Sequence, residues 1–216
     1  MTADLSQLDA QTFDRTLSAA AGVFARHGLR GLDMASVLAE VATATGLDPA
    51  ALRRDFPTRL DLAYAIALNS TRRLVNDQLA DHRPGCPAER IERLVRRHID
   101  HCWHRRTEED LRRDVLPTLR AVDPARYREL SDLRYSYLEH LRSIVADGVA
   151  QEHFSVSGSG ATASRVLETL ESVVNWYEPH DGLSAEELGD VCTDLIIHHH
   201  LGGPRDCAAR AGAWPA

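Results

Sequence analysis

Apolar residues recur at intervals of three and four along most of this chain, and they nowhere alternate with polar residues as a strand would require. Phe13, Leu17, Ala20 and Phe24 show the pattern near the N-terminus. This spacing places an apolar stripe along one face of a helix. The pattern therefore predicts an all-α fold, and we expect about nine helices in a chain of 216 residues.

Composition and charge exclude several classes of protein. The formal net charge of −7 argues against a surface covered in positive charge for generic nucleic-acid binding, although it permits a local basic site. The first residues lack the basic start and apolar segment of a signal peptide, and no apolar run reaches the roughly twenty residues of a membrane span. The four cysteines have no paired spacing. We therefore expect a soluble, cytoplasmic protein with reduced thiols and without a membrane partner.

The stretch TGLDPAALRRDFPTRLDL, residues 45–62, contains two helix starts separated by one helix stop. Asp48 and Pro49 form the first start, because the acid can cap free N–H groups and the proline ring pre-sets φ at the first helical position. Pro57 disfavours helical geometry at the residue before it, so this helix can only run from about 49 to 55. The sequence therefore predicts a helix of barely two turns between two longer ones.

The two longer helices complete a recognisable unit. The helix before the short one is MASVLAEVATAT, which Gly46 ends, and the helix after it begins at the capping residue Thr58 and runs to about residue 81. A short helix held at a steep angle to its predecessor is typical of a helix-turn-helix, in which the first helix braces and the second enters the major groove of DNA. The remaining helices are expected at about 88–105, 107–121, 124–152, 161–177 and 184–202.

The outward face of the short helix is the candidate DNA-binding site. Leu47, Leu52 and Phe56 are spaced to point inward, which leaves two arginines and a small alanine outside. Arginine can bond a guanine edge or a phosphate with two N–H groups, and alanine lets the backbone come close. The alternative is that these arginines lie on a solvated face, since residues 1–70 hold six arginines against eight acids. The residues expected to contact DNA are Asp48, Pro49, Ala50, Arg53, Arg54, Thr58 and Arg59.

Residues 12–62 resemble the DNA-binding domain of the TetR family of transcriptional regulators. The family's pattern around the short helix is, roughly, A-G-V-S-x-x-T-L-Y-x-H-F-x-S-K-E-x-L, and this chain offers T-G-L-D-P-A-A-L-R-R-D-F-P-T-R-L-D-L. The resemblance implies a three-helix DNA-binding head, a helical ligand-binding and dimerisation domain, and operator DNA as a partner. The matching positions are Gly46, Leu47, Asp48, Leu52, Phe56, Thr58, Arg59 and Leu62.

Three features depart from the family's pattern. Arg53 stands where the family usually has a tyrosine that contacts phosphate, which retains phosphate binding in a different geometry. Leu60 stands where the family has an acid, so we expect the local pairing of that acid to be absent. The segment VLAEVATATG is about four residues longer than its family equivalent, which is close to one helical turn. The extra turn, near residues 37–45, would lengthen the second helix without rotating its apolar face, and it would displace the short helix.

The C-terminal half resembles the ligand-binding and dimerisation domain of the same family. The best local match is LETLESVVNWYEPHDGLSAEELGDVCTDLIIHHHLGG, residues 167–203, in which two amphipathic helices form a hairpin. Such a hairpin suits a homodimeric four-helix bundle, and the alternative is that both apolar stripes cover the core of one subunit. The residues expected at the dimer seam are Leu167, Leu170, Val174, Tyr177, Leu188, Cys192, Leu195 and Ile196.

Aromatic residues with polar tips on the middle helices indicate a cavity for a small molecule. Branches of the family with this C-terminal segment often sense apolar acyl compounds, so the resemblance implies a small, hydrophobic effector. Several of the candidates will be ordinary core residues. The candidates are Trp103, Leu116, Leu119, Tyr127, Leu130, Tyr137, Leu138 and Leu141.

The histidine series does not indicate a metal site. His98, His101 and His104 follow one another at three-residue intervals, but successive members rotate by about 60° around a helix and cannot converge on one metal ion. We expect solvated histidines and no metal site there.

The chain has no Gly-rich phosphate loop, nucleophile elbow or H-E-x-x-H motif, so we expect no enzymatic activity, catalytic residue or cofactor.

These features predict a DNA-binding domain over residues 1–57, a ligand-binding and dimerisation domain over 58–203, and a mobile tail over 204–216. The expected function is that of a ligand-responsive homodimeric repressor, which binds a palindromic operator and is released by its effector. The alternative is a TetR-like helical dimer that has lost normal DNA reading and serves as a small-molecule-binding or protein-interaction module. The extra turn and the acids of the head motivate that alternative.

Overall fold

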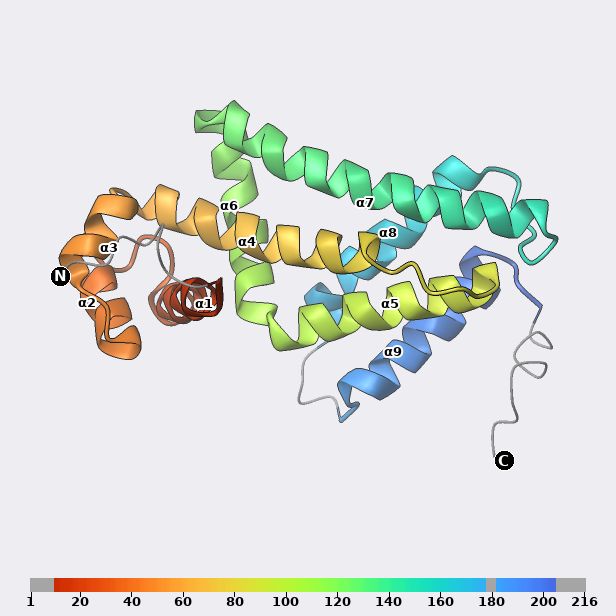
Figure 1. Cartoon of the computed structure of the whole chain (residues 1–216), viewed down its shortest axis with the longest axis horizontal. Helices are drawn as coiled ribbons and strands as arrows, with labels where there is room; N and C mark the ends of the chain where they lie inside the picture. Colours follow the sequence, from red (N-terminus) through yellow and green to blue (C-terminus); the bar gives the residue numbers. More distant parts are fainter. Residues whose placement is uncertain (1–9, 178–181, 205–216) are drawn as a thin grey trace. The chain divides into compact units, whose positions relative to one another are not determined.

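The computed structural model describes residues 10–177 and 182–204, apart from the side chains of residues 174–176. All regular structure within those ranges is helical, which confirms the predicted all-α fold (Figure 1). The helices are α1 (Ala10–His27), α2 (Met34–Thr45), α3 (Pro49–Asp55), α4 (Arg59–Leu79), α5 (Pro87–His104), α6 (Arg106–Val122), α7 (Pro124–Ala150), α8 (Ser159–Trp176), α9 (Ala185–Asp194) and the π-helix η3 (Leu195–His200).

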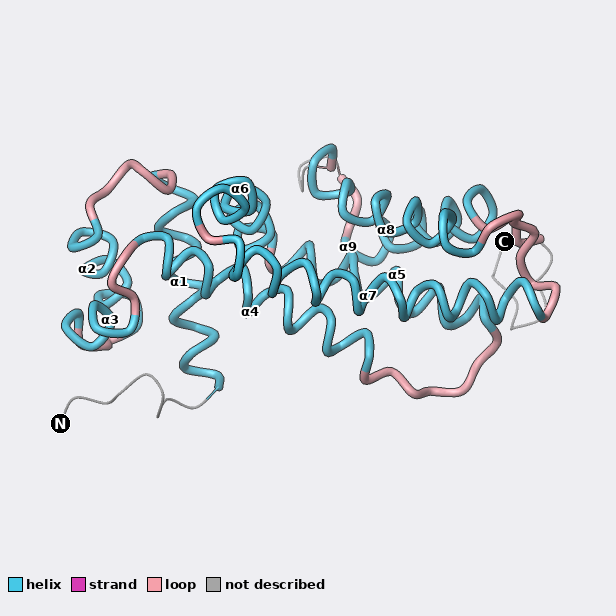
Figure 2. The backbone as a smooth tube through the Cα atoms, turned by 90° about the horizontal axis from the view of Figure 1, so that it is seen from above, coloured by secondary structure: helices cyan, strands magenta, loops and turns pink. Residues whose placement is uncertain are grey.

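Figure 2 shows the loops that join these helices, among them the connection between α4 and α5. From α3 to α8, every helix begins and ends within two residues of the bounds predicted from the sequence. The tail predicted at 204–216 lies outside the described residues except for its first position. No helix in the described part of the chain is long and apolar enough to cross a membrane.

The chain forms two compact units. The first contains residues 1–73 and 105–133, and the second contains 74–104 and 134–216. The first unit therefore includes α6 and the beginnings of α4 and α7 together with α1, α2 and α3. The division predicted at residues 57 and 58 marks where the expected DNA-binding segment ends along the chain, and it stays a prediction.

The core of the first unit explains why its three N-terminal helices hold together. Leu17, Ala20 and Phe24 of α1 are at most 3% exposed and face buried residues of α2, α3, α4 and α6. Leu119 and Leu130, from the end of α6 and the start of α7, belong to the same core. Burying one leucine side chain stabilises a fold by about 1.5–3 kcal/mol, so this cluster is the main source of the unit's stability.

The second unit is built around α5, which packs against both α8 and α9. The last helix departs from the sequence prediction of one α-helix over 184–202, because α9 ends at Asp194 and a π-helix follows. Ile196 and Leu201 are both fully buried, although five residues on an α-helix would separate them by about 140°. The wider π turn, with the N–H of Leu201 donating to the carbonyl of Ile196 at 2.9 Å, puts both side chains in the core.

Candidate DNA-binding site

The turn between α2 and α3 sets the angle of the short helix. Gly46 ends α2 in the left-handed region at φ 76°, where residues with a Cβ are disfavoured. Asp48 caps α3 by accepting a hydrogen bond from the N–H of Ala50 at 3.0 Å, and Pro49 occupies the first turn. The helix stops at Asp55 because Phe56, which precedes Pro57, leaves helical geometry. These findings confirm the boundaries predicted for the short helix.

The inner face of α3 anchors it to the head. Ala51 and Leu52 are buried, and Phe56 at the C-cap is 7% exposed; the burial of Leu52 and Phe56 is as predicted from their spacing. The N–H of Phe56 donates to the carbonyl of Leu52 at 2.8 Å, which closes the helix. α2, the brace for this face, runs for 12 residues to Thr45, so the residues expected to form an extra turn, 37–45, are helical.

The outer face of α3 presents the predicted DNA-contact residues to solvent. Asp48, Pro49, Ala50, Arg53 and Arg54 are all exposed. Arg53 makes no hydrogen bond or ion pair with any residue that the structure describes. The guanidinium of Arg54 lies 3.9 Å from its neighbour Asp55, which is the outer limit of an ion pair. Both arginines are therefore available to an incoming ligand.

The start of α4 carries the other two predicted contact residues. Thr58 is exposed and forms a reciprocal cap with Asp61: its N–H and hydroxyl donate to Asp61 Oδ2 at 2.9 and 2.7 Å, and the Asp61 N–H donates back at 3.1 Å. Leu60 provides no acid at the family's position, as expected, but the turn does have an acidic partner. The acid stands one residue later, in the capping pattern T-x-x-D, which the sequence displays.

Arg59 has a bracing contact that the sequence did not indicate. Its Nη1 donates to the backbone carbonyl of Leu32 at 2.6 Å, which ties the start of α4 to the loop before α2. Backbone hydrogen bonding to Ser36 is the main cause that lowers the pKa of Asp33, the N-cap of α2, and the charge of Arg59 adds to it. Arg59 is half-buried, so it is less accessible than the arginines of α3.

The residues predicted to bind a ligand are divided between the two units. Leu119 and Leu130 are buried in the core of the first unit, and Leu116 and Tyr127 are partly buried against that core. Trp103, Tyr137, Leu138 and Leu141 belong to the second unit. The eight residues therefore do not line one cavity within either unit, and their role in binding stays a prediction.

Polar groups inside the second unit make the better candidate for an effector site. Tyr137 is 2% exposed, and its hydroxyl lies 3.1 Å from Nδ1 of His98, whose ring stacks on it. Burial raises the pKa of Tyr137 well above its usual value, so its hydroxyl stays protonated. Trp103 stacks on Tyr177 with 5.7 Å between ring centroids. Gln78 is also buried, and its Oε1 has no hydrogen-bond partner among the described residues.

These contacts also change the interpretation of the histidine series. His98 is 2% exposed, so the expectation of a solvated histidine is wrong for this position. The described residues contain no group of three His, Cys, Asp or Glu side chains placed to hold a metal ion.

Most residues predicted at the dimer seam lie inside the protomer. Leu167, Leu170 and Ile196 are fully buried, and Tyr177, Leu188 and Cys192 are at most 5% exposed. Burial raises the pKa of the Cys192 thiol to about 11. Leu195 is exposed, as is Val191 one turn before it on α9, while the side chain of Val174 is outside the described set. Among the described members of the predicted seam, only Leu195 is exposed to a second subunit. Val191, which is not a member of the predicted seam, is exposed beside it.

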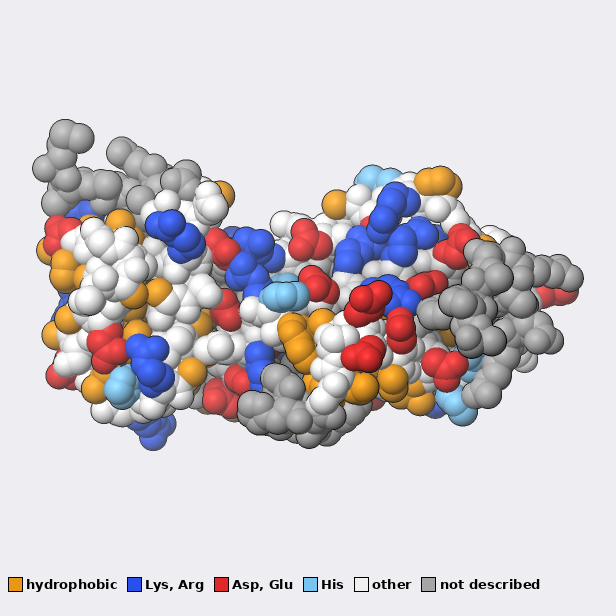
Figure 3. All heavy atoms as spheres, turned by 90° about the horizontal axis from the view of Figure 1, so that it is seen from below, with side chains coloured by type: hydrophobic (Ala, Val, Ile, Leu, Met, Phe, Trp, Pro, Cys, Tyr) orange, Lys and Arg blue, Asp and Glu red, His pale blue; other side chains and the backbone are white. Residues whose placement is uncertain are grey.

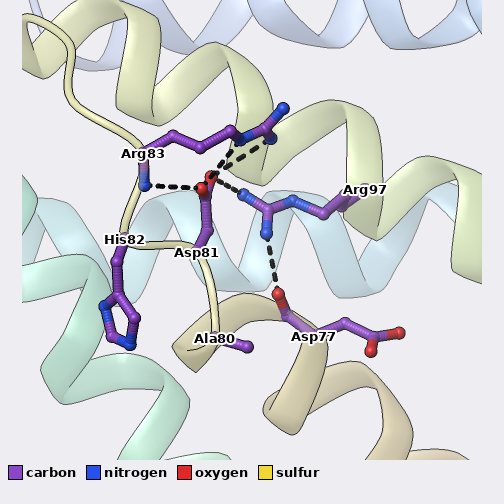
Figure 4. Close-up of a pocket in the computed structure, with 6 residues that line it drawn as sticks. All are labelled: Asp77, Ala80, Asp81, His82, Arg83 and Arg97. Atoms are coloured by element: carbon purple, nitrogen blue, oxygen red, sulfur yellow. Dashed lines mark hydrogen bonds and ion pairs between the residues drawn. The ribbon is translucent and has the colours of Figure 1, made fainter.

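An open hollow of about 600 Å³ lies in the second unit beside the α4–α5 loop (Figure 4). Its centre is Asp81, whose carboxylate binds Arg83 at 2.9 Å, Arg93 at 3.0 Å and also Arg97. Hydrogen bonds from Arg83 are the largest cause that holds the pKa of Asp81 far below its usual range. Arg97 also donates to the backbone carbonyl of Asp77 at 2.7 Å. Arg97 therefore caps the end of α4. The three arginines are already paired with the carboxylate of Asp81.

One face of the molecule carries charges of both signs. On the face drawn in Figure 3, arginine and acidic side chains are interspersed among the residues whose side chains are described. This mixture is consistent with the net charge of −7. The exposed arginines of α3 therefore do not belong to a surface of uniform positive charge.

Comparison with known proteins places these features in a family. The family model "Tetracyclin repressor-like, C-terminal domain" matches residues 84–199. The TetR family transcriptional regulator PfmR from Thermus thermophilus is 24% identical, with a TM-score of 0.73 over 85% of this chain and 97% of that chain. A regulatory protein in the tetR family from Rhodococcus RHA1 is 19% identical, with a TM-score of 0.75 over 91% of this chain and 100% of that chain.

A third solved structure shows a similar protein with its ligands. It is AibR in complex with isovaleryl coenzyme A and operator DNA, which is 16% identical with a TM-score of 0.67 over 86% of this chain and 98% of that chain. No curated protein sequence matches the chain. At these identities the structural likenesses show a shared fold.

Proposed function

Because the chain belongs to the TetR family of transcriptional regulators, we propose that it is a dimeric repressor that binds a palindromic operator and is released by a small, apolar effector. Members of this family bind operators and small molecules, act as dimers and are generally not enzymes. Three parts of the proposal go beyond family membership: the operator contacts, the dimer seam and the effector.

The exposed outer face of α3 is the observation that carries the proposal. A rigid helix that buries Leu52 and exposes Arg53 and Arg54 can enter a major groove without unfolding any part of the head. Guanidinium groups recognise guanine edges and phosphates, and Ala50 leaves room for close approach. Thr58, exposed at the start of α4, would add a phosphate contact by turning its hydroxyl from Asp61 to the phosphate.

Dimerisation follows from the requirements of DNA reading. One short helix binds too weakly to be specific, and two must lie about 34–36 Å apart to read a palindrome. Val191 and Leu195 are 51% and 36% exposed, and these apolar side chains on neighbouring turns support a seam formed by α9 and η3. The buried members of the predicted seam would support this surface from inside.

The effector is proposed to enter the second unit among its buried polar groups. Tyr137, His98 and the unpartnered Oε1 of Gln78 offer hydrogen bonds inside an otherwise apolar core. AibR binds isovaleryl coenzyme A, and by analogy we expect an acyl compound here. α4 contains Gln78 near one end and Arg59 at the other, so a ligand that shifts this helix would alter how the head binds DNA.

The function can be tested by selecting operators from fragmented genomic DNA with the purified protein. Bound fragments should share a dyad with half-sites about one duplex turn apart, and fluorescence anisotropy should show salt-sensitive binding to them. Isovaleryl coenzyme A and free fatty acids serve as effector probes, and a releasing compound should weaken operator binding. Recovery of no common palindrome, with acyl compounds still bound, would replace this proposal with the alternative of a helical dimer that no longer reads DNA. The extra turn of α2 is the feature that favours that alternative.

A further inference from the structure

The start of α4 contains a charge that conflicts with DNA binding. Asp61 caps Thr58 and thereby stabilises the first turn of α4, but it also places a carboxylate beside the residue proposed to contact phosphate. A carboxylate repels a phosphate of the same sign, and water and salt screen the repulsion only in part at short range. The head therefore needs a means to offset this charge.

Arg126, in the first turn of α7, lies against the same carboxylate. Its Nη1 is 2.8 Å from Asp61 Oδ1, the oxygen that does not bind Thr58. Its Nε is 3.3 Å from Asp123, and its guanidinium carbon lies 4.8 Å from the centre of the Tyr64 ring. Ring and carboxylates hold the guanidinium in one place, with 32% of the side chain exposed.

Asp61 is ionised at neutral pH in this arrangement. Burial raises its pKa, but hydrogen bonds from Thr58 and Arg126 lower it by more, so the pKa lies below its usual value. Asp61 therefore carries a negative charge at neutral pH in the turn that is proposed to face DNA.

We propose that Arg126 is a positioning residue for operator binding, which offsets the charge of Asp61 and thereby keeps the capped start of α4 able to accept a phosphate. The inference rests on the proposed DNA-binding function, because it concerns the same surface. It adds a residue from α7 to a site otherwise formed by α3 and α4.

A second set of contacts joins α4 and α7, so Arg126 is not the only residue that holds these helices together within the described structure. The hydroxyl of Tyr64 donates to Glu129 of α7, and Arg72 of α4 binds the same carboxylate at 2.5 Å. Arg126 packs on the Tyr64 ring but is neither donor nor acceptor in these two hydrogen bonds. Loss of Arg126 should therefore leave α7 docked on α4 within the first unit.

The test is a double-mutant cycle between Arg126→Ala and Asp61→Asn, with operator affinity measured by fluorescence anisotropy at several salt concentrations. Asparagine keeps an oxygen that can cap Thr58 but removes the charge. Arg126→Ala should weaken operator binding on the order of tenfold at low salt, because the uncompensated charge occurs twice in a dimer. The loss should shrink at high salt and largely disappear when Asp61→Asn is added.

Two further variants serve as controls. Arg126→Lys keeps the charge and should restore most of the affinity. Arg128→Ala removes an exposed arginine two residues away, which has no ion pair among the described residues, and should bind as the wild type does. Thermal unfolding of each variant reports whether it folds.

The outcomes separate this inference from the function on which it depends. If the wild type binds no operator, the proposed function and this inference are both wrong. If the wild type binds but Arg126→Ala binds equally well, only the inference is wrong. An equal loss with and without the Asp61 charge would also overturn it, since Arg126 would then contact DNA directly or act through the fold.

Discussion

Replacing Arg53 or Arg54 by alanine should weaken operator binding and leave folding intact. Both side chains are exposed, and the only ion pair described for either is the 3.9 Å contact between Arg54 and Asp55. Surface substitutions of this kind usually change the free energy of unfolding by less than about 0.5 kcal/mol. Any large loss of DNA binding would therefore report lost contacts with the duplex.

The size of the loss distinguishes base contacts from phosphate contacts. A bidentate contact to a guanine contributes about 1–3 kcal/mol of discrimination, and each substitution occurs twice in a dimer, so a base-reading arginine should cost about 2–6 kcal/mol. A phosphate-binding arginine should weaken binding to all sequences alike. It should also reduce the slope of log K against log salt by about 0.9 per phosphate, or about 1.8 per dimer.

Fluorescence anisotropy with the selected operator and with point-mutated operators, from about 50 to 300 mM salt, measures both quantities. Circular dichroism melts of the same samples check folding. Arg128→Ala is the matched control, because it removes another exposed arginine from outside the proposed surface. Unchanged affinity and salt slope in both α3 variants would refute the assignment of this face to DNA.

Three further substitutions test local contacts that stabilise the fold. Asp48→Ala removes the 3.0 Å cap of α3 and should destabilise the head by about 1 kcal/mol in urea unfolding, with weaker operator binding. Arg105→Ala removes the two hydrogen bonds, of 3.0 and 2.6 Å, that Arg105 donates to Asp14. It should lower the free energy of unfolding by about 2 kcal/mol, which is less than the roughly 3–5 kcal/mol lost when a fully buried ion pair is broken. Burial raises the pKa of Asp14, but hydrogen bonds from Arg105 and others lower it by more, so this stabilisation is present above the unfolded pKa of about 3.9 and is lost as the pH falls through the folded value. Gly148→Ala would place a Cβ 2.0 Å from the ring of Phe154, and we expect a loss of about 1–3 kcal/mol in urea unfolding.

Each of these predictions has a control or a contrary result. For the cap of α3, Asp48→Asn keeps an oxygen that can accept the Ala50 N–H and should retain most of the stability, whereas equal losses in both variants would contradict the capping argument. Gly22→Ala, whose new Cβ would be 3.6 Å from the nearest side-chain atom, should be neutral or stabilising by up to about 1 kcal/mol. A similar effect of both glycine substitutions would contradict the argument from close packing. For Asp14, the difference in unfolding free energy between wild type and Arg105→Ala should be constant from pH 7 to about 5 and shrink below about pH 4. A difference that grows on acidification would show that the carboxylate is not the partner that matters.

The sequence predicts local structure in this chain well because the signals that start and stop its helices are local. Asp48, Pro49 and Pro57 act through their own and adjacent peptide groups, so the bounds of α3 follow from three residues. Ser184 and Glu187, three residues apart in the sequence, form a capping box at the start of α9, which is a local signal of the same kind.

The periodicity of apolar residues does not predict which helices pack against one another. A buried stripe shows that a face is covered but does not identify what covers it, which is why Leu167 and Leu170 could be interpreted as a dimer seam although the protomer buries them. The same limit applies to the predicted ligand residues, which divide between two units. Arg126 was missed because its partner, Asp61, lies 65 positions earlier, and no local pattern joins the two.

Because α3 is short, its outer face can be changed without changing the face that packs on the core. With 7 residues, most of its peptide groups lack a partner within the helix, and an isolated peptide of this length would not stay helical. The helix is stable in the protein because Leu52 and Phe56 pack in the core. Grafts of new residues at positions 50, 53 and 54 could therefore redirect the protein to other DNA sequences without redesigning its interior, whereas α3 removed from its scaffold would recognise nothing.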